Sequence, residues 1–390
     1  MKKHVTQSQL VLVISVLIMM ISTGFSPGSP VYAATPMVKN AVFVDKNNHS
    51  FIPFRFLNGY SGITTTWNPA EKRMDIVKKD IKLTLYLGQA TAYINDKPVS
   101  LTELAFSDNG ITYVPLSFVS KALGMQLEWN AMASSISLKS EDISATLPVL
   151  TGALNQQESQ AIVSGKKNYK VGSRSFSVQT VTITLLHPKV KLDVVLAGDT
   201  VGKVEELSSL AKRNNAIVAI NGTFFDAYTK GDYKAPYGYI VSGGKMLKNS
   251  SGDRRAIFTY DKNHLAALIP GLDFKDRFAA KAIEGGLQAG PRLLTDGKIS
   301  LDVKGEGFKD PKILTGGGAR SALGLTRDHK LILLTSSGAT IPQLAEIMKQ
   351  AGAYQAMNLD GGASSGLYYN GKYLTTPGRQ ISNAIVIKYQ

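Results

Sequence analysis

The sequence predicts an α+β protein of two domains: a small α+β module built from an internal repeat, then a larger domain with a mixed β-sheet and flanking helices. The chain has 390 residues, which favours more than one domain. Its first third contains the same pattern twice, and its second half alternates short apolar runs with glycine-rich turns. With 44% hydrophobic and 19% charged residues, the composition argues against disorder and against a membrane bundle.

The residue types available restrict the chemistry. The chain has no cysteine, which excludes disulfides, Cys-ligated metal sites and thiol nucleophiles. Five histidines make a His-rich metal site or a Ser-His-Asp triad a poor explanation. If the protein is an enzyme, we expect carboxylates to do its chemistry.

The N-terminus predicts a signal peptide over residues 1–33. Lys2 and Lys3 precede an apolar run at 10–21, and Val31-Tyr32-Ala33 fits a small-x-Ala cleavage site. A single transmembrane anchor is the alternative, but the run is shorter than the roughly 20 residues that a spanning helix needs. We therefore expect a secreted protein with no stable membrane insertion after cleavage.

The net charge predicts the surroundings of the exported protein. Removing Lys2 and Lys3 with the signal peptide lowers the formal charge from +15 to +13. A cationic exported protein suits an anionic cell wall, so we expect wall association. The lysines are dispersed and no arginine-rich helix is present, so we expect no nucleic acid partner.

The repeat organises residues 34–145. Pro53 and Pro115 are 62 residues apart, and so are Trp67 and Trp129, the only two tryptophans. Such self-similarity marks two copies of one supersecondary unit.

Each copy predicts a strand, a short helix and a further strand. In the second copy the helix spans 116–123, ends at Gly124, and is followed by a strand at 135–138. We expect the two tryptophans to anchor the core, with sugar stacking as the alternative.

This pattern resembles the stalk domain, also called the copper amine oxidase N-terminal-like domain, of exported bacterial proteins, over residues 38–139. The resemblance implies an attachment or spacer module. It does not imply copper, because no cluster of His or Cys ligands is present.

A linker, or the start of the second domain, is predicted at residues 146–170, where glycine, serine and glutamine interrupt the apolar pattern. The second domain then occupies residues 171–390. Its patterns predict, in order, a strand at 178–186, a helix at 201–214, a buried strand at 216–220, a hairpin of 321–326 with 331–335, a helix from a Thr340 capping box to Gly352, a strand at 354–359, a hairpin at 368–373 and a last strand at 384–389.

Two of the buried strands deliver polar residues into glycine-rich turns. Asn221 and Asp226 follow the first, and Asp360 and Ser364 follow the second. Glycine lets a backbone approach a ligand closely, and successive N–H groups in such turns can hold an anion. Three further segments place glycines beside a charged side chain, and these side chains are Glu284, Arg292 and Arg320. We expect the five segments to share one cleft.

These motifs resemble the phosphodiester glycosidase family, whose eukaryotic member removes N-acetylglucosamine from a sugar phosphodiester. The resemblance covers about residues 172–390, and Asn358-Leu359-Asp360-Gly361-Gly362-Ala363-Ser364 is its most specific part. It implies a glycoside hydrolase that acts on the phosphodiester of a phosphorylated glycan or wall polymer.

That reaction suggests a role for each candidate residue. Asp360 is expected to face C1 as nucleophile or as base for water, with Asp226 or Glu284 as a second carboxylate. The arginines are expected to clamp the phosphate, and the remaining residues to contact the sugar or approach it with backbone N–H groups. The first set is Arg320, Arg379 and Arg292, and the second is Asn221, Ser364, Asn383, Gly361 and Gly362. Salt bridges to these same acids (Asp360, Asp226 and Glu284) are the alternative for the arginines, and a turn or strand-edge role is the alternative for Asn383.

Two other functions stay open. A binding protein would hold the glycan without cleaving it. A metal-dependent phosphodiesterase would use Asp226, Glu284 and Asp360 as ligands of a divalent cation and would break the P–O bond. No cofactor is required by any motif, and a structural or catalytic calcium is compatible with the sequence.

Overall fold

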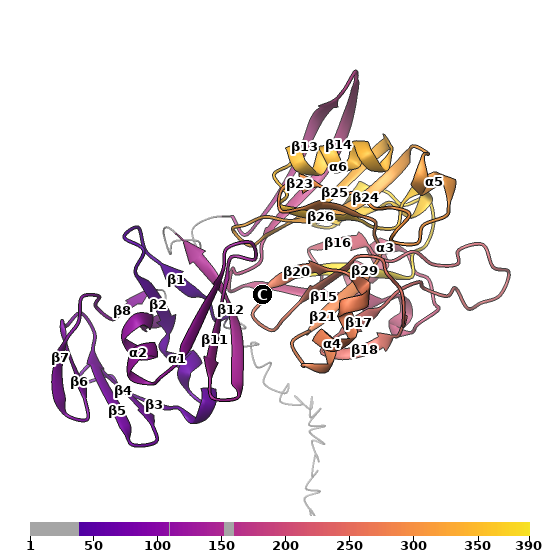
Figure 1. Ribbon diagram of the computed structural model, residues 1–390. Coiled ribbons are helices and arrows are strands. Elements are labelled where there is room, and N and C mark those ends of the chain that lie inside the picture. Colours follow the sequence, from indigo (N-terminus) through magenta and orange to yellow (C-terminus); the bar gives the residue numbers. More distant parts are fainter. Residues whose placement is uncertain (1–38, 109, 152–159) are drawn as a thin grey trace, which may run out of the picture. The chain divides into compact units, whose positions relative to one another are not determined.

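A computed structural model describes residues 39–108, 110–151 and 160–390 (Figure 1). The predicted signal peptide and cleavage site lie outside these residues. All of these described residues belong to one compact unit. Strands dominate its described part and helices are few and short, which confirms the predicted α+β class. No helix in the described part is long and apolar enough to span a membrane.

The N-terminal domain consists of two sheets and short helices. The sheets have the strand orders β10-β11-β12-β1-β2-β9-β8 and β3-β4-β5-β6-β7. The elements are β1 Val42–Val44, β2 Ser50–Pro53, α1 Phe54–Leu57, η1 Tyr60–Gly62, β3 Thr64–Asn68, β4 Arg73–Lys78, β5 Ile81–Tyr86, β6 Thr91–Ile94, β7 Lys97–Ser100, β8 Phe106–Asp108, β9 Ile111–Pro115, α2 Leu116–Ala122, β10 Gln126–Asn130, β11 Ser135–Ser140 and β12 Ile143–Thr151.

The two repeats pair with each other through their first strands. β2 and β9 are antiparallel, and Ile52 lies opposite Val114. Each strand leads through proline into a helix, α1 or α2, and then into an antiparallel pair, β3–β4 or β10–β11. The predicted order of strand, helix and strand is therefore present in both copies, with Trp-Asn inside the strand that follows the helix.

The expectation that the tryptophans anchor the core is wrong. Trp67 is 39% exposed and Trp129 is 51% exposed. Trp67 lies opposite the buried Met74, and Trp129 opposite the buried Ile136. Both tryptophans are on edge strands, β3 and β10, where no outer strand covers the side chain.

The C-terminal domain contains three sheets. Their strand orders are β13-β14-β25-β24-β26-β22-β23, β15-β29-β16-β27-β28 and β18-β17-β21-β19-β20. The elements are β13 Ile162–Val171, β14 Arg174–Thr184, β15 Val190–Leu196, η2 Ala197–Asp199, α3 Leu207–Arg213, β16 Val218–Asn221, β17 Ile240–Ser242, β18 Lys245–Lys248, β19 Ile257–Tyr260, β20 Ala266–Ile269, η3 Gly271–Asp273, α4 Phe274–Ala279, β21 Gly285–Gln288, β22 Arg292–Thr295, β23 Lys298–Ile299, α5 Pro311–Leu314, β24 Gly318–Leu325, β25 Lys330–Ala339, α6 Ile341–Gln350, β26 Gln355–Asn358, η4 Gly362–Ser364, β27 Leu367–Tyr369, β28 Lys372–Thr375 and β29 Asn383–Tyr389.

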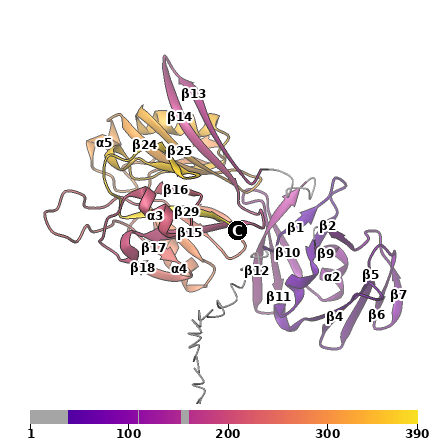
Figure 2. The same ribbon diagram turned by 180° about the vertical axis from the view of Figure 1, so that it is seen from behind.

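One core unites the three sheets. Its buried members include Leu323 from the first of these sheets, the seven-stranded sheet of the C-terminal domain, Ile385 from the second sheet and Leu287 from the third. α6 covers the seven-stranded sheet with Leu344 and Ile347, and α3 covers the second sheet (Figure 1). The segment between β16 and β17 is a long loop that extends away from the domain in both Figure 1 and Figure 2.

The structure places two of the predicted boundaries more closely. Within the predicted boundary at 146–170, β12 continues to Thr151 and β13 of the second domain begins at Ile162, while residues 152–159 lie outside the described part. The helix predicted at 201–214 begins only at Leu207, because Glu205 before it forms a β-bridge with Ile381. The Thr340 capping box and the C-terminal Gly352 of α6 are confirmed.

Candidate active site

Asp360 lies where the chain crosses from one sheet to another. It follows β26 of the seven-stranded sheet by two residues. The backbone N–H of Leu359 donates to Ser321 O at 2.8 Å, and that of Asp360 donates to Gly222 O, at the end of β16 in the second sheet, at 3.0 Å. β24 and the end of β16 therefore both fix the backbone at Asp360.

The Asp360 carboxyl is half-buried, and its environment changes its acidity. Its Oδ1 accepts a hydrogen bond from Gly361 N at 2.9 Å. Burial raises the pKa of this carboxyl to about 7, although the Ser364 hydroxyl, the Gly361 N–H and the charge of Arg379 each act to lower the pKa. A carboxyl with a pKa near 7 suits acid–base work at neutral pH.

Arg379 connects Asp360 to two residues that the sequence reasoning missed. Its Nη2 donates to the Tyr228 hydroxyl at 2.8 Å, and its guanidinium lies 4.8 Å from the centre of the Tyr228 ring. This hydrogen bond, then the charge of Arg379 and that of Lys312, lowers the pKa of the Tyr228 hydroxyl. We call Asp360, Ser364, Arg379, Tyr228 and Lys312 the Asp360 cluster.

Tyr228 and Lys312 carry no glycine-rich signal. Tyr228 is 78% exposed on the long loop after β16, and Lys312 is exposed on α5. A search for chemistry at strand ends passes over both residues, because a loop and a one-turn helix bring them to the cluster. The loop is held at its base, where Asp226 N donates to Ala235 O at 2.9 Å.

The structure gives Asn221 a positioning role in place of the expected contact with sugar. The side chain is buried, and its Nδ2 donates to Asp360 O at 2.7 Å. Its Oδ1 accepts from Ser321 Oγ at 2.7 Å and from Gly366 N at 3.0 Å. Because Oδ1 accepts two hydrogen bonds and Nδ2 donates one, the Asn221 amide connects the two ends of the Asp360 turn, at Asp360 and Gly366.

Replacing Asn221 with alanine is expected to lower the free energy of unfolding by about 3 kcal/mol, because three buried partners lose their hydrogen bonds. Urea unfolding measures this as a lower midpoint. Asn168→Ala is the control, since Asn168 is exposed on β13, and we expect a change within about 0.5 kcal/mol. If the Asn221→Ala protein has normal stability but binds substrate more weakly, Asn221 contacts the sugar as first expected.

Asn383 takes the strand-edge role that the sequence left as its alternative. It is buried at the start of β29, where Oδ1 accepts from Thr223 N at 2.9 Å and Nδ2 donates to Thr223 Oγ1 at 2.7 Å. A Cβ on Gly222 would lie 2.1 Å from Asn383 Oδ1. Gly222 is therefore required for this close approach.

Arg320 is mainly structural but keeps one free edge toward the Asp360 turn. Its Nε donates to Ala339 O at 2.9 Å, and its Nη2 donates to Lys312 O and Gly316 O at 2.7 and 2.8 Å. Nη1 has no partner among the described residues and lies 3.6 Å from the position of a Cβ on Gly361. Arg320 thus fixes the backbone of Lys312, and only its Nη1 group is left to bind a phosphate.

Gly361 and Gly362 form the turn after Asp360. A Cβ on Gly361 would lie 3.0 Å from Ala319 O, and Gly362 has a φ of +60° that favours glycine. The sequence predicted that the backbone N–H groups of Gly361 and Gly362 approach the substrate. The Gly361 N–H already donates to the Asp360 carboxylate, whereas the Gly362 N–H does not.

Arg292 and Glu284 are not brought to Asp360. Burial lowers the pKa of Arg292, and the charges of Glu306, Asp296 and Asp273 oppose this shift. These acids are not the ones that the salt-bridge alternative named. Its Nη2 is buried without a hydrogen-bond partner in the described part of the chain.

Glu284 precedes β21 at the end of that strand remote from the site. Its backbone N–H donates to Tyr260 O at 2.8 Å, and its O accepts from Gly244 N at 2.7 Å. Asn358 bonds to Gly290 beyond the other end of β21, and the four residues of that strand span roughly 13 Å. Asp226 is nearer along the chain, two residues before Tyr228, and its Oδ1 accepts from Thr229 N at 3.2 Å.

Within the described residues, no group of three or more His, Asp or Glu side chains could hold a metal ion. The Asp360 cluster itself supplies one carboxyl with a raised pKa, two cations, a phenol and the Ser364 hydroxyl. This arrangement fits attack at a centre that carries an anionic leaving group.

Comparison with known proteins found a match in each half of the chain. Residues 214–388 match the phosphodiester glycosidase family, and residues 32–138 match the copper amine oxidase N-terminal domain. Both matches agree with the resemblances that the sequence motifs predicted.

Solved structures share the fold. The catalytic domain of zebrafish N-acetylglucosamine-1-phosphodiester alpha-N-acetylglucosaminidase, auto-inhibited by its pro-peptide, is 23% identical, with a TM-score of 0.50 over 61% of this chain and 87% of that chain. A hypothetical protein from Synechocystis is 14% identical, with a TM-score of 0.53 over 90% of this chain and 99% of that chain. No curated protein matches the chain significantly.

Proposed function

We propose that the C-terminal domain hydrolyses the C1–O bond of a sugar 1-phosphodiester of the N-acetylglucosamine type, in cell-envelope or extracellular glycans. The observation that carries the proposal is the Asp360 carboxyl, whose pKa is raised to about 7 beside the cation of Arg379. The family match supports the reaction class.

Asp360 supplies the base or the nucleophile. Breaking the C1–O bond sends its electron pair to the phosphate oxygen and builds positive charge at C1. As a base, ionised Asp360 takes a proton from the water that attacks C1. As a nucleophile, it bonds to C1 and is then displaced by water. Both routes need the carboxylate and release free sugar and a phosphate monoester.

Arg379 and Lys312 stabilise the leaving group. The phosphate monoester leaves as an anion, so it needs cations more than it needs a general acid. Arg379 keeps guanidinium N–H groups beyond the one bonded to Tyr228. Asp226, at the base of the Tyr228 loop, is the candidate second carboxylate.

Export and wall association are part of the proposal. They are supported by the signal-peptide pattern of residues 1–33 and by the formal charge of +13 that remains after its removal. The wall polymers that attract a cationic protein also contain sugar phosphodiesters, so the same surroundings would supply a substrate.

Isotope labelling tests the bond that breaks. The purified protein is given methyl N-acetylglucosamine 1-phosphate in ¹⁸O-water, and the released methyl phosphate is examined by ³¹P NMR. Phosphate does not exchange its oxygens with water under these conditions. Unlabelled methyl phosphate is expected, because water attacks carbon, and the first anomer of the free sugar distinguishes base from nucleophile.

Other outcomes assign the other functions. If ¹⁸O appears in the phosphate and the reaction stops when chelator is added, the protein is a metal-dependent phosphodiesterase and the proposal is overturned. Binding of the diester without turnover would identify a glycan-binding protein. Loss of C–O cleavage with chelator, restored by calcium, would add a divalent cation to the glycosidase.

A further inference from the structure

We propose that the N-terminal domain carries a glycan-binding groove centred on Trp129, separate from the Asp360 cluster. The groove has a volume of about 750 Å³, within the range of small-molecule sites. Its walls come from β1, β2, β10 and β12 of the N-terminal domain and from the turn between β24 and β25. None of its lining residues belongs to the Asp360 cluster.

Trp129 provides a flat apolar surface. Its indole is 51% exposed on the edge strand β10, an unusual position for the largest apolar side chain. The apolar face of a pyranose ring, formed by C–H groups, stacks on such a surface while its hydroxyls point outward. Trp67 occupies the equivalent position in the first copy and is also exposed, but it does not line the groove.

Polar groups around the indole fit sugar hydroxyls. The Asn48 side chain has no hydrogen bond to any described residue, and Asn130 uses only its Oδ1, which accepts from Ala133 N at 2.9 Å. Both amides can therefore donate and accept at the rim. The hydroxyls of Ser50 and Ser134 lie along the same wall.

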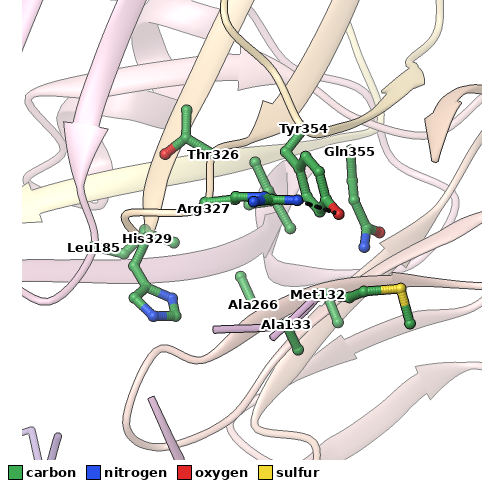
Figure 3. Close-up of a pocket in the computed structure, with 11 residues that line it drawn as sticks. Met132, Ala133, Leu185, Ala266, Thr326, Arg327, His329, Tyr354 and Gln355 are labelled. Atoms are coloured by element: carbon green, nitrogen blue, oxygen red, sulfur yellow. Dashed lines mark hydrogen bonds between the residues drawn. The ribbon is translucent and has the colours of Figure 1, made fainter. Parts of the chain in front are cut away.

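The two charged residues of the groove already have partners. They are Arg327 and Asp328. Asp328 Oδ2 is paired with Lys330 at 2.6 Å. The Arg327 guanidinium lies 4.2 Å from the centre of the Tyr354 ring and donates to the Tyr354 hydroxyl at 2.9 Å, as Figure 3 shows. Both charged side chains are thus engaged by other residues, and the occupant that we propose is a neutral sugar.

The neighbouring hollow is too small to be the binding site. It shares Arg327 with the groove, has a volume of about 40 Å³, and is bordered by Met132, His329 and Gln355 (Figure 3). Such a volume holds a water molecule or two. The His329 ring beside it contacts Ser134 O at 3.0 Å and so fixes one wall of the larger groove.

Fluorescence tests the groove directly, because the chain has two tryptophans and Trp67→Phe leaves Trp129 as the only one. Titration of this variant with the N-acetylglucosamine tetramer is expected to shift the emission saturably. Trp129→Ala, followed by calorimetry, is expected to weaken binding about tenfold. Trp67→Ala is the matched control and is expected to bind normally.

Trp129→Phe keeps a ring and is expected to retain part of the affinity, which separates stacking from a folding defect. An unchanged emission in the Trp67→Phe protein, or equal affinities of the Trp129→Ala and Trp67→Ala proteins, would overturn the proposal. Because the assays measure binding, their outcome does not depend on whether the C-terminal domain cleaves a phosphodiester.

Discussion

Asp360→Asn is expected to lower the turnover number for a sugar 1-phosphodiester by about three orders of magnitude or more, because the amide can neither attack C1 nor accept a proton from water. The readout is the steady-state release of free sugar. The matched control is Glu284→Gln, which removes a carboxylate at the far end of β21 and is expected to keep nearly full activity. Activity of the Asp360→Asn protein within a few-fold of wild type would remove Asp360 from the chemistry.

The same substitution should leave the protein folded and, at high pH, stabilise it. The pKa of Asp360 is raised to about 7 in the folded protein, whereas in the unfolded chain it is near 4. As the pH rises from 4 to 7 the unfolded chain releases this proton first, so wild type loses stability in this window. Thermal unfolding should therefore favour Asp360→Asn over wild type at pH 8, but not at pH 4.

The second large effect is expected in the pH dependence of kcat/KM. The ionised carboxylate is the reactive form, so kcat/KM should rise about tenfold per pH unit below 7 and level off above it. Arg379→Gln should move this rise to higher pH, because the charge of Arg379 lowers the pKa of Asp360. The variant should also lose about a hundredfold in kcat/KM on the plateau, through the lost contacts with the phosphate.

The pH profile also tests the direction of proton transfer. A fall in kcat/KM as the pH rises through 7 would mean that protonated Asp360 is the active form and acts as a general acid. Glu284→Gln again serves as control, since it should keep the wild-type profile. A profile that Arg379→Gln does not move would place Arg379 outside the Asp360 cluster.

Local sequence patterns predicted much of the fold. Apolar runs bounded by glycine predicted strands close to β16, β26 and β29, and the contacts of Thr340 with Gln343 defined the start of α6. The constant spacing of Pro53 and Pro115 revealed the repeat. Each of these signals depends on residues within a few positions of one another, or on a copied pattern.

The side-chain roles at the site were not readable in this way. Asn221 follows a strand as predicted, but its partners lie 100 to 145 residues away in the sequence. A motif shows that a polar residue is required without showing whether substrate or backbone uses it. Arg320 is the same case, because three carbonyl groups occupy most of its guanidinium.

The sequence by itself determined the α+β class, the two domains, the repeat and the placement of Asp360 at the end of a buried strand, because each depends on local pattern. Only the tertiary structure decided that Tyr228 and Lys312 join Arg379 beside Asp360, that Glu284 and Arg292 do not, and that Trp129 is exposed. Burial, hydrogen-bond partners and edge positions arise from contacts between distant segments. The raised pKa of Asp360, on which the proposed function depends, is a product of that burial.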